Sequence, residues 1–298
     1  MVPAGAAVKF RVQASEAAMR LDALLAARLG ISGAEARRLL ERGAVRVDGR
    51  TCNLRDKGTR PRLGATVDVA PAFDIPEPQP DLPLTILAQG PGWVAVDKPA
   101  GMPVHPLGPG ERGTALNFLV AHHPQIVGVG EGGLRGGVVH RLDVETSGAL
   151  LFATDQPTWD VLRASFAGHT ARKIYRAVVR GEMGGDGRCD LPLRVARHRP
   201  ALVRVGGGRG SRMCGLRWRA VQALRDATLV EVELETGFLH QIRVTFAHLG
   251  HPVLGDRVYG AGDAARLMLH ASRVQAGPAR ALSPDPGDFA QVVRALLV

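Results

Sequence analysis

The chain has 298 residues, 45% of them hydrophobic, and is therefore long enough for two domains of about 100–200 residues with buried cores. Its 38 Lys and Arg residues exceed its 28 Asp and Glu residues, and the net charge of +10 predicts a polyanionic partner, nucleic acid before membrane. No stretch approaches the ~18 apolar residues that span a bilayer, and residues 1–12 lack a secretory pattern, so we expect a cytoplasmic protein.

The chain begins with a helical region. Leucines at helical spacing predict a helix over residues 21–29, which Gly30 should end. Ser32 and Glu35 then match a capping box, in which the Ser32 side chain caps the Glu35 amide and the Glu35 carboxylate returns to the Ser32 amide. This pattern predicts a second helix that ends at Gly43.

The same region is strongly basic. Residues 18–64 hold eleven Arg and Lys against five Asp and Glu, a net charge of +6, and the alternation over residues 45–49 before an Asp-Gly turn predicts a β-hairpin. Such charge alone is equally compatible with a solvated surface. The string from Arg20-Leu21-Asp22 to Arg46-Val47-Asp48-Gly49-Arg50, however, resembles an S4 domain, an RNA-binding module. The resemblance implies RNA contacts by Arg37, Arg38, Arg42 and Arg46.

A proline-rich segment separates this module from the rest of the chain. Residues 71–83 carry five prolines with acidic residues between them, which favours an extended conformation and predicts a semi-rigid linker. We therefore expect a small α/β-type S4-like domain over residues 1–70, a linker over 71–83 and a larger domain over 84–298.

The larger domain mixes strands and helices without regular alternation. Strand-like runs occur near residues 93–96, 173–179 and 229–234, and helical stretches occur near 113–122, 156–168 and 239–249. This order predicts an α+β domain with a mixed, largely antiparallel sheet and argues against a doubly wound fold.

One part of this domain is unusually rich in arginine. Residues 191–225 contain nine arginines and no acid, and strand-like stretches there surround the glycine-rich tip at 206–210. This composition predicts a basic hairpin, with Arg209 at its tip, that contacts RNA backbone. The alternative is a charged edge strand that prevents aggregation of the sheet.

The most informative stretch is residues 140–151, His-Arg-Leu-Asp-Val-Glu-Thr-Ser-Gly-Ala-Leu-Leu. It places Asp143 between Arg141 and a Thr-Ser-Gly turn, with apolar strand-like residues on both sides. A charged residue beside buried strands is costly unless a partner or a reaction requires it. An isolated Asp of this kind more often caps a turn. The whole string resembles the signature of the RluA family of RNA pseudouridine synthases, with Ala149 as its one departure.

Further strings in the same order extend the resemblance from residue 82 to about 275. They begin at Asp97-Lys98-Pro99, Lys173-Ile174-Tyr175, Thr236-Gly237-Phe238 and His251-Pro252-Val253. The third string departs from the family pattern, because Phe238 stands where an arginine is usual. That departure puts an RNA contact in doubt more than the chemistry.

The resemblance implies the pseudouridine synthase fold and its reaction. The reaction breaks the N1–C1′ bond of a uridine, rotates the base and rejoins it through C5, so we expect no cofactor and no metal. Asp143 would attack C1′ or remove the C2′ proton, and the sequence leaves both routes open. Arg243 would pair with Asp143, a phosphate contact being its alternative, and Tyr175 would lie against the base, a buried core tyrosine being the alternative.

A uridine in folded RNA must leave its stack before it can react. By resemblance, Arg141 would fill or hold the space that the base vacates, and His140 would have a mainly structural role. The full set of substrate-binding candidates is Arg141, His140, Lys173, His240 and Gln241.

We therefore expect an RNA-uridine isomerase that acts as a monomer on large-subunit ribosomal RNA. A tRNA uridine isomerase is the alternative within the enzyme class. A non-catalytic RNA-binding or ribosome-assembly protein is the alternative outside it, and the presence of Asp143, Tyr175 and Arg243 together argues against it.

Overall fold

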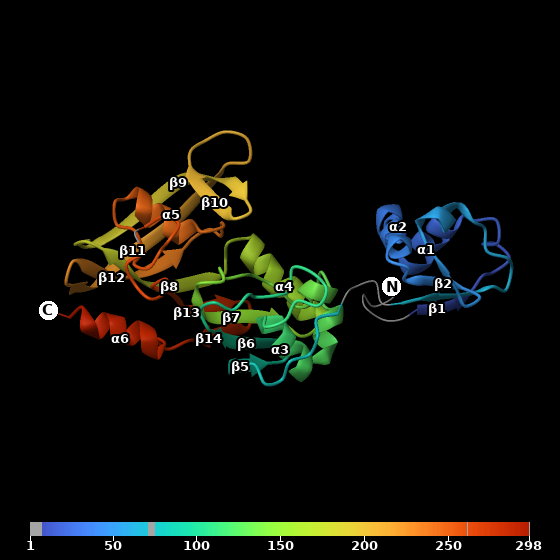
Figure 1. Ribbon diagram of the computed structural model, residues 1–298, viewed down its shortest axis with the longest axis horizontal. Coiled ribbons are helices and arrows are strands. Elements are labelled where there is room, and N and C mark those ends of the chain that lie inside the picture. The colour runs from blue at the N-terminus through green and yellow to red at the C-terminus, as the bar shows by residue number, and fades with distance from the viewer. Residues whose placement is uncertain (1–7, 71–74, 261, 298) are drawn as a thin grey trace.

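The start of the chain folds as two helices beside a four-stranded antiparallel sheet (Figure 1), in a computed structural model that describes residues 8–70, 75–260 and 262–297. The strand order of this sheet is β1-β4-β2-β3. Its elements are β1 (Val8–Arg11), α1 (Leu21–Leu29), α2 (Gly33–Glu41), β2 (Val45–Val47), β3 (Arg50–Cys52), the 3-10 helix η1 (Leu54–Gly58) and β4 (Thr66–Val69).

The local signals in this part of the sequence are confirmed. Gly30 ends α1 with φ 66°, a left-handed conformation that glycine adopts without steric strain. Ser32 Oγ accepts from the Glu35 amide at 3.2 Å, and the Glu35 carboxylate accepts from the Ser32 amide at 2.8 Å, which completes the capping box of α2. Asp48 and Gly49 both have positive φ, the geometry of a tight turn between β2 and β3.

Leucine burial stabilises this first unit. Leu21, Leu24, Leu25 and Leu40 are fully buried in one cluster with Val67 of the sheet. Each such leucine contributes about 1.5–3 kcal/mol relative to an exposed one. The charged side chains lie outside this cluster, and the exposed set includes Arg37, Arg38, Arg42 and Arg46.

Part of the proline-rich segment is bonded to the larger domain. The Gln79 amide donates to the Asn117 carbonyl at 3.0 Å, and the Asn117 side chain donates to the Glu77 carbonyl at 2.8 Å. The Gln79 side chain also accepts from the Gly113 amide at 2.6 Å. Residues 71–74 of the expected linker lie outside the described residues. Residues 77–79 are anchored to the larger domain and do not form a free spacer.

A ten-stranded sheet organises the larger domain, in the order β10-β9-β11-β12-β8-β13-β7-β6-β5, with β14 paired to β13. Its strands are β5 (Thr85–Gly90), β6 (Trp93–Lys98), β7 (Ser147–Ala153), β8 (Arg172–Arg180), β9 (Asp186–His198), β10 (Ala201–Val205), β11 (Arg212–Leu224), β12 (Ala227–Leu234), β13 (Leu269–Ala276) and β14 (Ala279–Leu282). Among the described residues, β13 and β7 form the one parallel pair of strands. The predicted α+β class with a mixed, largely antiparallel sheet is confirmed.

Helices of this domain fall on the three predicted stretches and on three others. They are α3 (Ala115–His122), the 3-10 helices η2 (Pro124–Gly128) and η3 (Gly133–Arg135), α4 (Gln156–Ala167), α5 (Gln241–His248) and α6 (Gly287–Ala295). Helices α3, α4 and α5 correspond to the three predicted from sequence. No helix of the described part of the chain is long and apolar enough to cross a membrane.

Strand β7 is buried along its whole length, because its two faces belong to different apolar clusters. Leu150 and Phe152 pack in one cluster, and Leu151 packs in the other. At the start of the strand Gly148 has φ 117°, and a Cβ there would clash with the Ala271 carbonyl of β13. Glycine is therefore required where β7 meets β13. This close packing fixes the end of the loop that enters β7.

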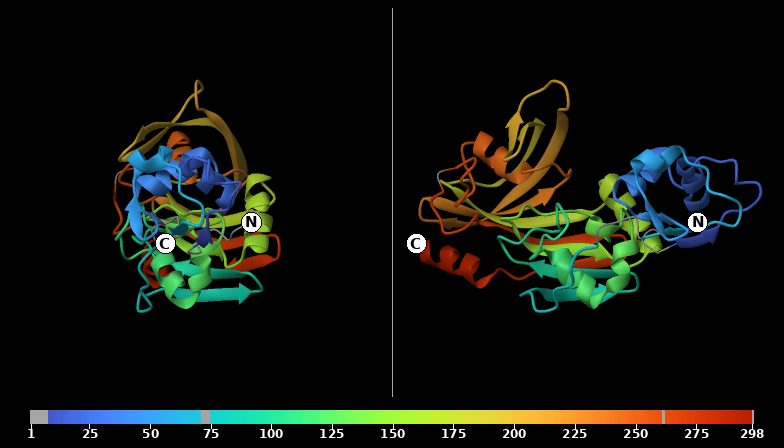
Figure 2. Two further views of the ribbon diagram at one scale, coloured as in Figure 1. Left: turned by 90° about the vertical axis from the view of Figure 1, so that its right-hand side faces the viewer. Right: turned by 45° about the vertical axis from the view of Figure 1, so that its right-hand side comes forward.

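Strands β9 and β10 form the end of the sheet opposite β5 and extend away from the body of the domain (Figure 2). A small apolar cluster joins them to α5 through Leu193, Val203, Cys214 and Val244, with Phe238 packed at its side. The glycine-rich tip lies between β10 and β11. The prediction of a hairpin here is right, but its turn was placed wrongly: β9 and β10 pair across residues 199–200, whereas the glycine-rich residues 206–210, with Arg209, connect β10 to β11, with which β10 does not pair. The hairpin rests on the helix that carries Arg243.

Candidate active site

Asp143 lies in the loop that leads into β7. The Thr146 amide donates to the Asp143 carbonyl at 3.0 Å and closes a turn there. The Asp143 side chain is 22% exposed, and within the described part of the chain its carboxylate accepts no hydrogen bond. A carboxylate held in this way keeps its lone pairs available for a reacting group.

A buried lysine ties this loop to the end of β6. Lys98 is fully buried, and its Nζ donates to the carbonyls of Pro99, Met102 and Val144 at 2.9, 2.8 and 2.9 Å. Burial lowers the pKa of Lys98 to about 7, although the charge of Asp143 opposes that shift. Since Val144 is the residue after Asp143, Lys98 restrains the backbone of the candidate catalytic residue.

Arg243, in the first turn of α5, lies between two carboxylates. Its Nε and Nη2 donate to Asp256 at 2.7 and 2.9 Å, and its Nη1 lies 3.6 Å from Asp143 Oδ2. Burial lowers the pKa of Arg243, but Asp256 and Asp143 outweigh it and raise the pKa overall. Burial likewise raises the pKa of Asp256, while Arg243 and the amides of Tyr259 and Val258 bring it below its usual range. Asp256 therefore fixes the guanidinium, and one edge of it remains for Asp143.

His240 precedes α5 in a left-handed conformation, with φ 52°. Its Nε2 lies 4.0 Å from Asp143 Oδ2, and its Nδ1 lies 2.9 Å from the Tyr259 hydroxyl. Burial lowers the pKa of His240, against the attraction of Asp143. The imidazole is therefore neutral at neutral pH, and its two nitrogens have different roles.

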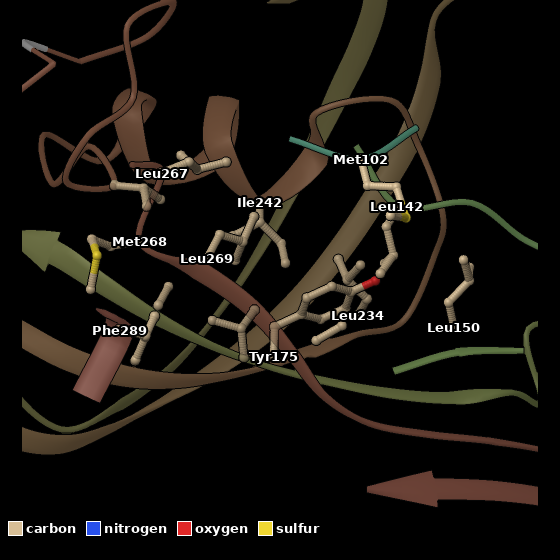
Figure 3. Close-up of a cluster of buried hydrophobic side chains, with 14 of the residues drawn as sticks. Met102, Leu142, Leu150, Tyr175, Leu234, Ile242, Leu267, Met268, Leu269 and Phe289 are labelled. Carbon is tan, nitrogen blue, oxygen red and sulfur yellow. The ribbon is translucent and has the colours of Figure 1, made fainter. Parts of the chain in front are cut away.

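Tyr175 occupies the buried face of β8 and is 7% exposed. Figure 3 shows its ring among apolar side chains that include Leu142 and Leu234. Burial raises the pKa of the Tyr175 hydroxyl well above its usual range, and the charge of Asp143 raises it further. This hydroxyl stays protonated at neutral pH, so it can donate a hydrogen bond or a proton but cannot act as a base.

Two of the predicted substrate-binding residues hold the turn before α5 in place. Lys173 Nζ donates to the Thr236 carbonyl at 2.8 Å, and burial lowers the pKa of Lys173 to about 8. Gln241 donates to the Gly215 carbonyl at 2.9 Å and accepts from the Phe238 amide at 3.1 Å. Both side chains therefore hydrogen-bond to the backbone of the protein itself.

Two predicted substrate-binding residues precede Asp143, and they differ in burial: His140 is enclosed by the protein, whereas Arg141 is exposed. The Leu151 amide donates to His140 Nε2 at 3.0 Å, and the imidazole stacks on Phe166 with ring centroids 4.5 Å apart. Burial lowers the pKa of His140 to about 3, so this ring is a neutral support of the loop. Arg141, next to it, is exposed beside the Asp143 loop.

The arginines of the 191–225 region divide into two groups. Arg217 and Arg219 pair with Glu235 and Glu231 on the sheet. The second group is exposed and makes no ion pair with any described residue; it consists of Arg194, Arg197, Arg199, Arg204, Arg209, Arg212 and Arg225. The uncompensated charge is therefore concentrated on β9, β10 and the loop that follows β10.

Among the described residues, neither the buried thiols nor any cluster of acidic side chains provides a further reactive or metal-binding group at this site. Burial raises the pKa of the free thiols of Cys52 and Cys214, so these stay protonated. Across residues 8–70, 75–260 and 262–297, no group of three or more His, Cys, Asp or Glu side chains could hold a metal ion.

Sequence reasoning assigned no role to three residues that shape the site, Lys98, Asp256 and Tyr259. Lys98 stands in the string that begins at Asp97, and Asp256 and Tyr259 lie in or just after the string that begins at His251, so position along the chain could have pointed to them. A buried arginine requires a carboxylate partner, and that requirement could have prompted a search for Asp256. Nothing in the local sequence indicates which carbonyls Lys98 contacts or which ring nitrogen Tyr259 meets.

Comparison with protein families gives two matches. Residues 92–248 match the family described as RNA pseudouridylate synthase, and residues 19–57 match the S4 domain. Asp143, Tyr175 and Arg243 lie within the first match. Arg37, Arg38, Arg42 and Arg46 lie within the second.

The chain is also similar to whole proteins. It is 40% identical over 204 residues to the ribosomal large subunit pseudouridine synthase D of Zymomonas mobilis, a match that covers 66% of this chain and 64% of that protein. It is 36% identical over 301 residues to an uncharacterized RNA pseudouridine synthase of Mycobacterium bovis, covering 94% of this chain and 95% of that protein. The solved structure of Human RNA Pseudouridylate Synthase Domain Containing 1 superposes with a TM-score of 0.57 at 22% identity, over 74% of this chain and 97% of that chain. The last likeness confirms the predicted fold.

Proposed function

The chain belongs to the RNA pseudouridylate synthase family, a family of isomerases, and from this premise we propose that it converts specific uridines of structured RNA to pseudouridine. The observation that carries the proposal is the Asp143 carboxylate, which accepts no hydrogen bond within the described residues and faces the one free edge of Arg243 at 3.6 Å. Large-subunit ribosomal RNA is the substrate we favour. The relatives from Zymomonas mobilis and Pseudomonas aeruginosa are named for that substrate, and the S4 match supplies an RNA-binding module.

In the proposed reaction Asp143 acts first. Its carboxylate attacks C1′ of the uridine, or removes the C2′ proton, and either step breaks the N1–C1′ bond and releases the uracil. The base then rotates and C5 bonds to C1′; in the first route this breaks the Asp143–C1′ bond, and in the second route Asp143 returns the proton to C2′. The C5 proton is then lost and N1 gains a proton, so all atoms are retained and nothing is oxidised. Arg243 orients the Asp143 carboxylate for these steps, since its Nη1 lies 3.6 Å from Asp143 Oδ2 and a guanidinium can donate hydrogen bonds to a carboxylate.

Tyr175 supports the base during its rotation. Its ring lies in an apolar wall, and its hydroxyl, protonated because its pKa is raised, can donate to the base or to the sugar. Arg141 is exposed next to the catalytic loop, where a guanidinium can stack in the space that an extruded base leaves. The unpaired arginines of β9 and β10 would contact the RNA backbone.

A direct assay tests the proposal. Purified protein should form pseudouridine in transcribed large-subunit ribosomal RNA, detected at single-nucleotide resolution. Asp143→Asn should abolish it while RNA affinity stays within a few-fold of wild type, because the amide keeps the shape and removes the charge. Absence of pseudouridine in ribosomal RNA and its formation in tRNA would redirect the substrate. Its absence in both, with RNA binding intact, would indicate the non-catalytic alternative.

A further inference from the structure

Tyr259 connects the basic hairpin to the candidate active site. Its hydroxyl accepts from the Val203 amide of β10 at 2.8 Å and lies 2.9 Å from His240 Nδ1. Its ring lies under the Arg243 guanidinium, whose central carbon is 5.3 Å from the ring centroid. The half-buried Tyr259 side chain therefore contacts strand β10 of the basic hairpin. It also contacts His240 and Arg243, the two residues whose side chains face Asp143.

The strand is irregular where this contact is made. The register between β10 and β9 shifts between Leu202 and Val203, so the ladder is interrupted at the residue whose amide bonds to Tyr259. Val203 itself is 1% exposed and belongs to the apolar cluster that seats the hairpin on α5. Movement of β10 would therefore move the Tyr259 hydroxyl.

The polarity of the hydrogen bonds determines the state of His240. The Tyr259 oxygen accepts the Val203 N–H, so its own proton is free to point at His240 Nδ1. A neutral imidazole that accepts at Nδ1 carries its proton on Nε2, and that nitrogen faces Asp143 Oδ2 at 4.0 Å. The opposite tautomer would turn a lone pair toward the carboxylate. The charged and titratable groups around His240 are Asp143, Arg243, Asp256 and Tyr259.

We propose that Tyr259 is a positioning residue that holds His240 as its Nε2–H tautomer against Asp143 and couples this arrangement to the seating of the β9–β10 hairpin. The inference rests on the proposed function and deepens it. The Tyr259 hydroxyl hydrogen-bonds both to the hairpin that would contact RNA and to His240 beside Asp143, so it links the two. Tyr259 acts on the reaction through His240 and does not itself touch the reacting atoms.

Tyr259→Phe tests the hydroxyl alone, because the ring and its contact with Arg243 remain. At saturating RNA the single-turnover rate should fall by about 10- to 100-fold, the loss expected for small misplacement of a catalytic group. The RNA dissociation constant should change by less than about threefold. Thr170→Val is the matched control, since it removes a hydroxyl bonded to Ser165 on the surface, and it should react at the wild-type rate.

Two further measurements separate positioning from packing. In a His240→Gln background, Tyr259→Phe should cause little additional loss, because residues that act through one another are not additive. The ¹⁵N imidazole shifts of wild-type protein, assigned to His240 with the Gln variant, should report an Nε2–H tautomer that is lost in Tyr259→Phe. A wild-type rate in Tyr259→Phe, a fully additive double variant, or an Nδ1–H tautomer in wild type would each overturn the inference. The tautomer is read without turnover, so a wild-type protein that makes no pseudouridine would refute the proposed function and leave this test standing.

Discussion

Asp256→Asn should be one of the most damaging single substitutions at the site. The Asp256 side chain is fully buried and accepts four hydrogen bonds, from Nε and Nη2 of Arg243 and from the amides of Val258 and Tyr259. The asparagine can keep one oxygen in place, but its NH₂ group must then face an Arg243 donor. Removing one member of a buried ion pair costs about 3–5 kcal/mol, and we expect a loss of unfolding free energy in that range.

The loss should also appear in turnover. Without Asp256, the closest remaining carboxylate to Arg243 is Asp143 at 3.6 Å, and the guanidinium should move toward it. A tight Arg243–Asp143 pair would occupy the lone pairs that the reaction requires. We therefore expect the single-turnover rate to fall by about 10²-fold or more, while binding through the S4-like module persists.

Urea unfolding followed by tryptophan fluorescence is a suitable assay, because Trp93, Trp159 and Trp218 are the three tryptophans and all lie in the larger domain. Glu233→Gln is the matched control, since it breaks an exposed pair with Arg172 and should cost less than about 1 kcal/mol. Similar unfolding free energies for Asp256→Asn and Glu233→Gln would refute the reasoning.

The stability difference between wild type and Asp256→Asn should also depend on pH. The pKa of Asp256 is lowered in the folded protein, so its stabilising contribution is fully present above the unfolded value of about 3.9. It is lost as the pH falls through the lower folded value. The difference in stability between wild type and Asp256→Asn should thus be constant near pH 7 and shrink in acid. A difference that grows on acidification would contradict this sign.

Two further predictions concern catalysis and binding separately. Tyr175→Phe should reduce the single-turnover rate by about 10²–10⁴-fold, because the only group lost is a protonated hydroxyl. The unfolding free energy of this variant should barely change, since the Tyr175 hydroxyl makes no hydrogen bond within the described residues. A near-normal single-turnover rate would instead show that Tyr175 only packs in the core. Removing residues 1–75 should make the negative slope of log K against log salt smaller in magnitude by about two units, as expected for the loss of three phosphate contacts, and leave the rate at saturating RNA largely unchanged. An unchanged slope would show that this module does not contact RNA.

The amino-acid sequence by itself determined the helix ends, caps and turns that depend on interactions between residues close together in the chain. Gly30, the Ser32–Glu35 capping box and the Asp48-Gly49 turn each act within a few residues through backbone dihedral angles and short hydrogen bonds. The same holds for the strand-like runs and the three predicted helices, because periods of 2 and 3.6 report which side of an element is buried. The string around Asp143 likewise indicated the candidate catalytic carboxylate before any contact was known.

The contacts that make Asp143 usable were decided by tertiary structure. Lys98 reaches the Val144 carbonyl across 46 residues, and Tyr259 reaches the Val203 amide across 56. Sequence paired Arg243 with Asp143, while in the structure its two short hydrogen bonds go to Asp256. Lys173 and Gln241, expected to face substrate, are taken up by the turn before α5. A residue type states what a side chain can bond to, but the folded backbone alone sets which of several compatible partners lies within 3 Å of it.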